Sequence, residues 1–124
     1  MQEKAKPFSM EVCPFDQDAA VAYVQLSGYL DAHTVVDFER VMDEQIRDDK
    51  RRFVIDMSRL NYTSSAGIGA LMRLMHNLCV RNGDLVLLGP SEKVLEVLEL
   101  LDFTRIFKLA RSPEEALILL QQGL

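Results

Sequence analysis

Residues 52–89 read RFVIDMSRLNYTSSAGIGALMRLMHNLCVRNGDLVLLG and contain two short apolar runs on either side of an amphipathic stretch. The runs at 52–57 and 84–89 are almost continuously apolar, which is typical of strands covered on both faces. Between them, apolar residues from Ile68 to Cys79 share one side of a helix that is expected to end near Asn82 and Gly83. Strand, helix and strand in this order predict parallel strands joined by a crossover helix.

The same alternation continues toward the C-terminus. Ser91 is expected to cap a third helix, and a short strand is expected at 106–109. Residues 112–115, Ser-Pro-Glu-Glu, supply an N-cap, a proline at the first helical position and a reciprocal glutamate, and so predict the start of a last helix. The third helix is predicted to turn five apolar side chains inward: Val94, Leu95, Val97, Leu98 and Leu101.

Toward the N-terminus the pattern begins with two strands. Residues 8–12 and 20–26 are joined by a short polar turn, which predicts an antiparallel hairpin, with the second strand stopping near Gly28. Thr34 is a candidate N-cap for the first helix, whose apolar stripe runs from Phe38 to Ile46. Residues 58–64 are expected to be a loop that leads into the second helix.

The predicted fold class is therefore α/β, with the element order β-β-α-β-α-β-α-β-α. We expect a single domain over residues 1–124, with residues 1–7 as a flexible tail, and a mostly parallel sheet with one antiparallel edge strand. Eight residues are predicted to be buried on this basis: Val54, Ile55, Leu71, Met75, Val86, Leu87, Leu98 and Leu101.

Composition and charge exclude several classes of protein. The chain of 124 residues has 14 Lys and Arg against 19 Asp and Glu, a net charge of −5 that argues against a nucleic-acid partner. The longest wholly apolar run, residues 116–120, is far too short to cross a membrane, and no apolar segment follows the N-terminal charges as in a signal peptide. Cys13 and Cys79 form no CxxC motif, so no metal site is expected, and the expected location is the cytoplasm.

Enzyme motifs fail on inspection. A nucleophile elbow needs glycine two residues before its serine, and Thr63 stands there before Ser65. Gly67 and Gly69 begin a dinucleotide fingerprint, but Met72 occupies its third glycine position. His33 and His76 are expected at the surface. We therefore expect no enzymatic activity and no cofactor. The alternative is a small serine hydrolase, and burst kinetics with an activated ester would be the evidence for it.

The segment from Asn61 to Gly69 is unusual, because small and hydroxylated residues and two glycines stand where a helix must begin. One interpretation is structural: Ser64 or Ser65 caps the helix, and the glycines allow close packing on the sheet. The other is a surface that a partner protein must reach, since no bulky or charged side chain occurs from Thr63 to Gly67.

The segment and its surroundings resemble the STAS domains of bacterial anti-sigma-factor antagonists. Residues 53–58 followed by 60–71 are similar to the family signature, in which a buried strand ending in aspartate runs into an (I/M)-D-S-(S/A)-G-(L/I)-G loop. Residues 26–34 resemble its G-x-L-D-x-x-(T/S) stretch, residues 97–107 its L-x-x-x-G-L-x-(R/K)-(I/L)-F stretch, and residues 112–117 its last-helix opening. The four stretches occur in the family's order and span nearly the whole chain.

The resemblance implies a binding switch. In its unmodified form such a protein sequesters an anti-sigma factor that is also a GHKL-type serine kinase, which releases a sigma factor, and a PP2C-type phosphatase reverses the phosphorylation. By position the phosphorylated serine is Ser65, with Ser64 as the second candidate, because Ser64 stands where the family often has aspartate. Asp102 replaces a frequent family glycine, which affects the cap of the third helix. The alternative is a STAS scaffold or regulatory module of a signalling or transport complex, with or without a bound nucleotide.

The partner-binding residues follow from where the parallel strands end. Asp31 follows the second strand and Ser65 the third, and carboxyl ends of parallel strands open at one edge of the sheet. Asp31 is also a candidate helix N-cap, in competition with Thr34. Six residues are predicted to form the partner surface around Ser65: Asp31, Thr34, Tyr62, Ser64, Gly67 and Ile68.

Overall fold

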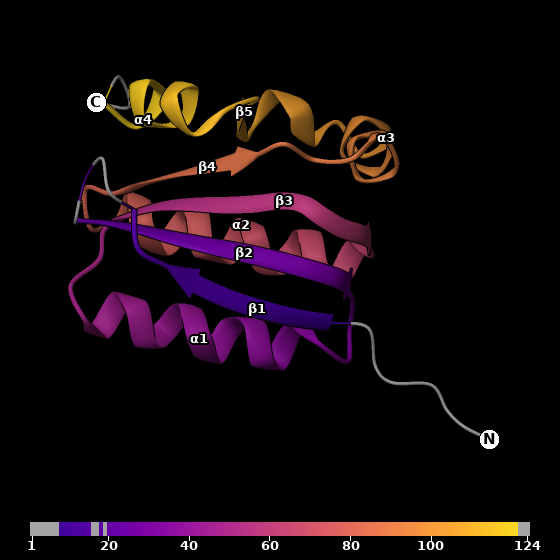
Figure 1. The fold of residues 1–124 in the computed structure, drawn as a ribbon. Coiled ribbons are helices and arrows are strands. Elements are labelled where there is room, and N and C mark those ends of the chain that lie inside the picture. The colour runs from indigo at the N-terminus through magenta and orange to yellow at the C-terminus, as the bar shows by residue number, and fades with distance from the viewer. Residues whose placement is uncertain (1–7, 16–17, 19, 122–124) are drawn as a thin grey trace.

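The computed structural model describes residues 8–15, 18 and 20–121, so the expected tail at 1–7 lies outside the described residues. Figure 1 shows one sheet with helices on both sides. The strands are β1 (Phe8–Cys13), β2 (Val21–Leu30), β3 (Arg52–Thr63), β4 (Asp84–Leu88) and β5 (Lys108–Ala110). The helices are α1 (Val35–Arg47), α2 (Ser65–Cys79), α3 (Glu92–Leu100), the 3₁₀ turn η1 (Phe103–Arg105) and α4 (Pro113–Gln121).

The strands lie in the order β1-β2-β3-β4-β5 across the sheet. β1 pairs with β2 antiparallel, and each later strand pairs with its predecessor in parallel. The predicted element order, the hairpin and the single antiparallel edge strand are therefore confirmed. Each parallel step places a helix over the sheet, as the short connections require.

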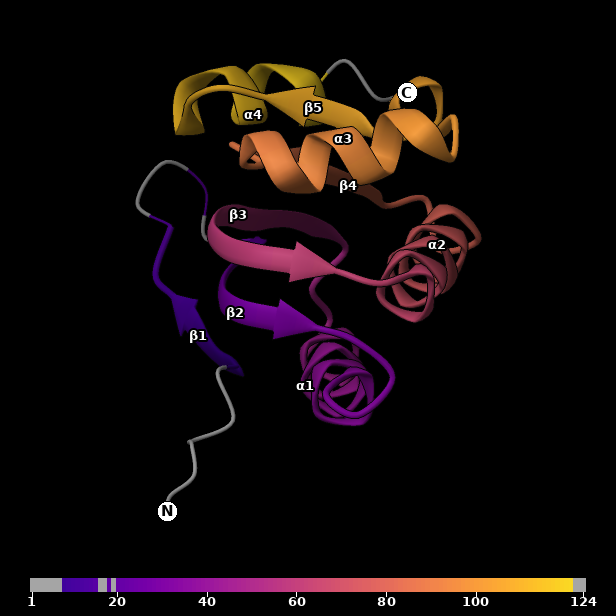
Figure 2. The same ribbon diagram turned by 90° about the vertical axis from the view of Figure 1, so that its right-hand side faces the viewer.

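Two apolar layers enclose the sheet. The larger joins α1, α2 and α3 to one face and includes Leu26, Phe38, Ile55 and Leu71. The smaller lies under α4 and includes Val54, Val86 and Ala116. Figure 2 shows the consequence: α1 and α2 cover the sheet on one side, whereas α4 lies beside β4 and β5. Alternate residues of β3 point to opposite layers, which explains its continuous apolar run.

Six of the eight core predictions hold. Val54, Ile55, Leu71, Val86, Leu87 and Leu98 are buried, and Met75 packs against the core half-buried. Leu101 is 42% exposed, so its predicted burial is wrong. The helix ends at Leu100, so Leu101 is its C-cap residue and no longer lies on the apolar stripe, and the left-handed Asp102 with φ of 63° then turns the chain away.

The expected loop at 58–64 is also wrong, because β3 continues to Thr63. β2 likewise runs past Gly28 to Leu30, and the two strands stay paired to the Leu30–Thr63 position. Two register shifts, between Gln25 and Ser27 and between Gly28 and Tyr29, interrupt this pairing. Such bulges break the two-residue alternation on which strand prediction relies.

The C-terminal region confirms the last helix and moves the last strand. The backbone N–H of Glu115 donates to Ser112 Oγ at 3.1 Å, and Glu115 Oε1 accepts from the N–H of Arg111 at 2.8 Å, as in a capping box shifted by one residue. The strand expected at 106–109 instead occupies Lys108–Ala110, because residues 103–105 form the 3₁₀ turn.

Candidate functional site

The ends of β2 and β3 bring two distant segments to one edge of the sheet. Leu30 and Thr63 are opposite partners, and the backbone N–H of Ser64 donates to the carbonyl of Leu30 at 3.0 Å. Asp31 and Ser64 therefore follow neighbouring strand ends, as the order of the parallel strands requires. In Figure 2 the arrowheads of β2 and β3 lead into α1 and α2 at this edge.

Ser64 occupies the N-cap position of α2 through its backbone. Its carbonyl accepts from the N–H of Ile68 at 3.0 Å, and its backbone is extended, as expected before a helix. Its hydroxyl makes no capping hydrogen bond, and Oγ is buried without a hydrogen-bond partner among the described residues. The capping interpretation of Ser64 therefore holds for the main chain but not for the side chain.

Ser65 is the first residue of α2, and its side chain is exposed. The first turn contains no acidic residue, so the positive end of this 15-residue helix faces solvent without a compensating carboxylate of its own. An anion attached to Ser65 would lie beside free backbone N–H groups, an arrangement that favours negative charge. The position suits a serine whose hydroxyl acquires a phosphate while α2 stays folded.

Gly67 is required by close packing of α2 on the end of β2. A Cβ atom at this position would lie 2.2 Å from Thr63 Oγ1 and 2.7 Å from the carbonyl oxygen of Leu30, both far inside contact distance. At Gly69 the nearest atom would be Arg73 Nη1 at 3.6 Å, an ordinary contact. Only the first of the two glycines is therefore dictated by space.

Three of the six predicted partner-binding residues lie below the surface. Ile68 is 1% exposed and Thr34 is 4% exposed, and Gly67 is also buried. Ile68 packs in the core under α2, because the inward face of the helix begins in its first turn. Their partner-binding role stays a prediction; their burial disfavours direct contact with a partner and favours a role in supporting the surface from beneath.

Asp31 and Thr34 hold the turn before α1. Asp31 Oδ1 accepts the backbone N–H of His33 at 2.9 Å and that of Thr34 at 3.2 Å. Thr34 Oγ1 donates to the carbonyl of Tyr29 at 2.9 Å and accepts the N–H of Asp31 at the same distance. Thr34 is the N-cap residue by position but makes no side-chain cap, so the carboxylate of Asp31 takes this structural role.

An aromatic pair lies near the ends of β2 and β3. Tyr29 and Tyr62 are opposite partners on β2 and β3, their ring centroids are 6.2 Å apart, and each is a little over two-fifths exposed. Tyr62 belongs to the predicted surface, whereas Tyr29 was missed, because the second strand was expected to stop near Gly28. Partly exposed tyrosines in contact are typical of protein interfaces.

A buried acid lies apart from this edge, on the sheet face opposite α1 and α2. Asp56 is 5% exposed and accepts from Tyr23 Oη at 2.6 Å and from both the N–H and the hydroxyl of Ser58. Burial opposes its ionisation, but hydrogen bonds from Tyr23, Ser58 and Gln25 outweigh this and hold the pKa of Asp56 below its usual value. Burial and the same carboxylate raise the pKa of Tyr23. The carboxylate of Asp56 thus has several hydrogen-bond donors around it, an arrangement typical of a structural role.

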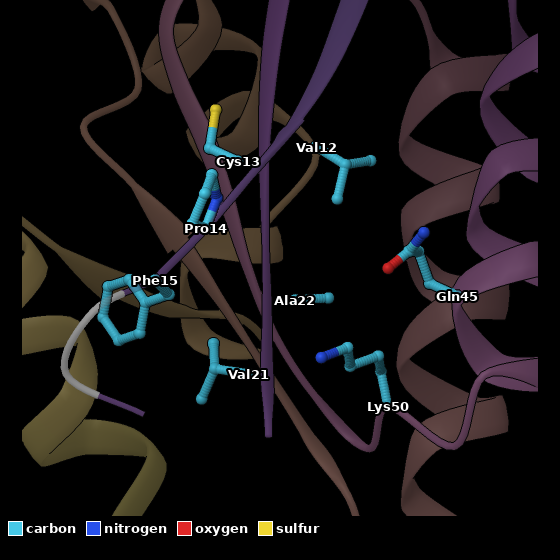
Figure 3. A pocket seen from close by; sticks show the side chains of 8 residues that line it. All are labelled: Val12, Cys13, Pro14, Phe15, Val21, Ala22, Gln45 and Lys50. Atoms are coloured by element: carbon cyan, nitrogen blue, oxygen red, sulfur yellow. The ribbon is translucent and has the colours of Figure 1, made fainter. Parts of the chain in front are cut away.

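A hollow of about 560 Å³ lies at the opposite end of the sheet from Ser65. Figure 3 shows Val12, Ala22, Gln45 and Lys50 around it on the side of α1, with Phe15 and Val21 on the other side of β2. β3 has 12 residues, so roughly 35–40 Å separate its two ends, and the hollow is far from Ser65.

Within the described part of the chain, no three His, Cys, Asp or Glu side chains are grouped as metal ligands. None of the helices there has the length and apolar character needed to cross a bilayer.

Comparison with known proteins identifies the fold and the family. The model of the STAS domain family matches residues 15–116. BtrV of Bordetella bronchiseptica, which is named as an anti-sigma factor antagonist, is 34% identical over 91 residues, covering 73% of this chain and 78% of BtrV. The anti-sigma-B factor antagonist of Staphylococcus aureus is 26% identical over 77 residues, which is 62% of this chain and 71% of that protein.

Solved structures of the anti-sigma factor antagonist SpoIIAA share the fold. Its unphosphorylated form has a TM-score of 0.72 at 24% identity, covering 94% of this chain and 97% of SpoIIAA. The Bacillus protein in its phosphorylated form has a TM-score of 0.66 at 22% identity, covering 89% and 96% of the two chains.

Proposed function

This chain belongs to the STAS domain family and to its anti-sigma factor antagonists, and we propose that it is a binding switch controlled by phosphorylation of Ser65. In the unmodified form it binds an anti-sigma factor that is also a GHKL-type serine kinase, and a sigma factor is released. The kinase phosphorylates Ser65, and a PP2C-type phosphatase restores the hydroxyl. These partners would meet the protein in the cytoplasm.

The observation that carries the proposal is the exposed hydroxyl of Ser65 at the start of α2. Ser64 fits the role less well, because its Oγ is enclosed and a kinase would have to open the helix start to reach it. SpoIIAA, which has the same fold, is known in phosphorylated and unphosphorylated forms. This supports a modification that leaves the domain folded.

The proposed partner surface is what remains exposed around Ser65. It consists of Tyr62 and half-buried Asp31, to which the structure adds Tyr29. We call these residues, together with Ser65, the serine edge. The tyrosine rings supply apolar area at the ends of β2 and β3, the end of the sheet at which α2 and Ser65 begin, and we propose that one partner contacts both.

The phosphate would act at the interface. It adds a charge of about −1.5 to −2, which the N-terminus of α2 accommodates but an enclosed protein contact does not. A loss of about 3 kcal/mol weakens binding roughly 100-fold, and leaving a phosphate unpaired in an interface can cost this much.

The test is incubation of the protein with the cognate kinase and ATP, followed by fragment mass spectrometry. We expect one phosphate, on Ser65. The Ser65→Ala variant is the matched control and should take up none. A phosphate on Ser64 or Thr63, or no phosphate at all, would contradict the assignment.

A further inference from the structure

β1 is an edge strand without the usual protection against pairing. It has six residues in unbroken register with β2, contains no proline or lysine, and lies outermost in the described sheet, as Figure 2 shows. β5, at the other edge, has only three residues. Natural proteins shorten, charge or bend exposed edges to prevent association, so a long regular edge indicates a strand that pairs with another chain.

A groove runs beside this edge on the side of α1. It has a volume of about 400 Å³, and Phe8, Met10 and Val12 form one wall while α1 forms the other. Val12 is 43% exposed, and Figure 3 shows it on the side of the sheet that faces Gln45 of α1. An added strand would place every second side chain in this groove while its backbone bonds to β1.

The strand that best fits the groove is β1 itself. Its apolar residues Phe8, Met10 and Val12 alternate on the groove side, and Glu11, its one charged residue, lies on the other face. The rim of the groove carries both signs of charge, with Arg40 lying 3.6 Å from Asp37 and 3.5 Å from Glu44. When two copies are related by a two-fold axis, Arg40 of one copy can face an acidic side chain of this rim in the other copy.

We propose that the outer edge of β1 is a homodimer interface, in which the β1 strands of two copies pair antiparallel about a two-fold axis at Met10. Facing residues of antiparallel strands lie on the same side of the sheet, so even positions must face even positions. Pairing Met10 with its own copy sets Phe8 against Val12 and Glu11 against Ser9. A shift in one direction would oppose the two Glu11 carboxylates, which is unfavourable, and a shift in the other direction would oppose the two Ser9 side chains and lose the Phe8–Val12 pairs.

The dimer would leave the serine edge free. β1 lies at one side of the sheet, and Ser65 lies at the end of β3, beyond β2. Each dimer would therefore display two serine edges. The interface is argued from β1 and α1 alone and does not depend on the proposed function.

The first test measures the mass of the full chain by sedimentation equilibrium under reducing conditions. We expect twice the chain mass of 14.1 kDa for the parent, and the single mass for Val12→Lys, which places a charge in the groove. Val80→Lys makes the same change at a 65% exposed valine after α2 and should remain dimeric. A parent that is monomeric up to millimolar concentration, or a dimer that survives Val12→Lys, would overturn the proposal.

The second test fixes the register without depending on the folding of the lysine variant. In a chain carrying Cys13→Ser and Cys79→Ser, Met10→Cys should form an intermolecular disulfide, because facing Cα atoms are about 4.5–5.5 Å apart. Val12→Cys should not, because its two copies would be displaced by four residues, about 13 Å. Crosslinking of the Val12 variant and not the Met10 variant would refute the interface, as would crosslinking of neither.

Discussion

Replacing Gly67 by alanine should destabilise the protein, although alanine is the better helix former. The added Cβ would lie 2.2 Å from Thr63 Oγ1 and 2.7 Å from the carbonyl oxygen of Leu30, so the start of α2 has to move away from the ends of β2 and β3 by about 1 Å. Overpacking of this kind costs about 1–3 kcal/mol, and the gain in helix propensity returns at most about 1 kcal/mol. We expect a net loss of roughly 1–2 kcal/mol.

Gly69→Ala is the matched control, two residues further along the same helix. Its Cβ would meet only Arg73 Nη1 at 3.6 Å, so the propensity gain is not offset and the variant should be about 0.5–1 kcal/mol more stable than the parent. Urea denaturation of the three proteins measures both effects. For a chain of 124 residues, each kcal/mol corresponds to about 4 °C in melting temperature.

The packing argument requires Gly67→Ala to be less stable than the parent and Gly69→Ala to be more stable. If Gly67→Ala is as stable as Gly69→Ala, the close approach of α2 to β2 is not a constraint, and the packing argument for this glycine is refuted. The loss at Gly67 should also be smaller in a Thr63→Ala background, because the nearest atom has been removed while the Leu30 carbonyl remains.

Two further predictions concern charge. Ser65→Asp should weaken binding to the anti-sigma kinase by a factor of about 10–1,000, whereas Ser65→Ala should bind as the parent does. Both variants should have melting temperatures close to that of the parent. If calorimetry gives Ser65→Asp the same affinity as the parent, the switch is contradicted. Folding lowers the pKa of Asp56 below its ordinary value of 3.8. The ionised carboxylate therefore contributes to stability above pH 3.8, and this contribution is lost as the pH falls through the lowered pKa. Tyr23→Phe removes a hydrogen bond to this carboxylate and should cost about 1–3 kcal/mol at pH 7, with a smaller difference near pH 3; a pH-independent difference in urea denaturation would count against the ionised network.

The central fold was predictable because its signals are local and mutually consistent. The apolar runs in β3 and β4 and the stripe of α2 each indicate one element, and short connections leave a parallel arrangement as the simple solution. The β1–β2 hairpin followed from two alternating runs joined by a short turn. These features need no knowledge of distant contacts.

The second half of β3 was not predictable by the same means. Ser58 and Arg59 are exposed in succession, as are Asn61 and Tyr62, with buried Leu60 between the pairs. This spacing follows from the bulges in the pairing with β2 and looks like a loop to any test of two-residue alternation. Tyr29 was missed for the same reason, since it faces Tyr62 only when both strands continue.

The sequence also did not reveal which residues near Ser65 are buried. Ile68 and Gly67 belong to the right segment, but the first turn of α2 already packs against the sheet, so sequence proximity to Ser65 did not mean exposure. The lack of space for a Cβ atom at Gly67 depends on how α2 packs against the ends of β2 and β3, which a single sequence does not reveal.

The tight seating of α2 also bears on how an enzyme would recognise Ser65. The main chain of Ser64 is bonded to the end of β2, and Gly67 leaves no space for the helix start to shift. A synthetic peptide of residues 58–72 carries the same hydroxyl, but a segment of this length holds little helix in water and has no β2 to rest on. A kinase acting on Ser65 must therefore read a three-dimensional shape assembled from separate parts of the chain, and linear consensus motifs would be poor guides to its substrates.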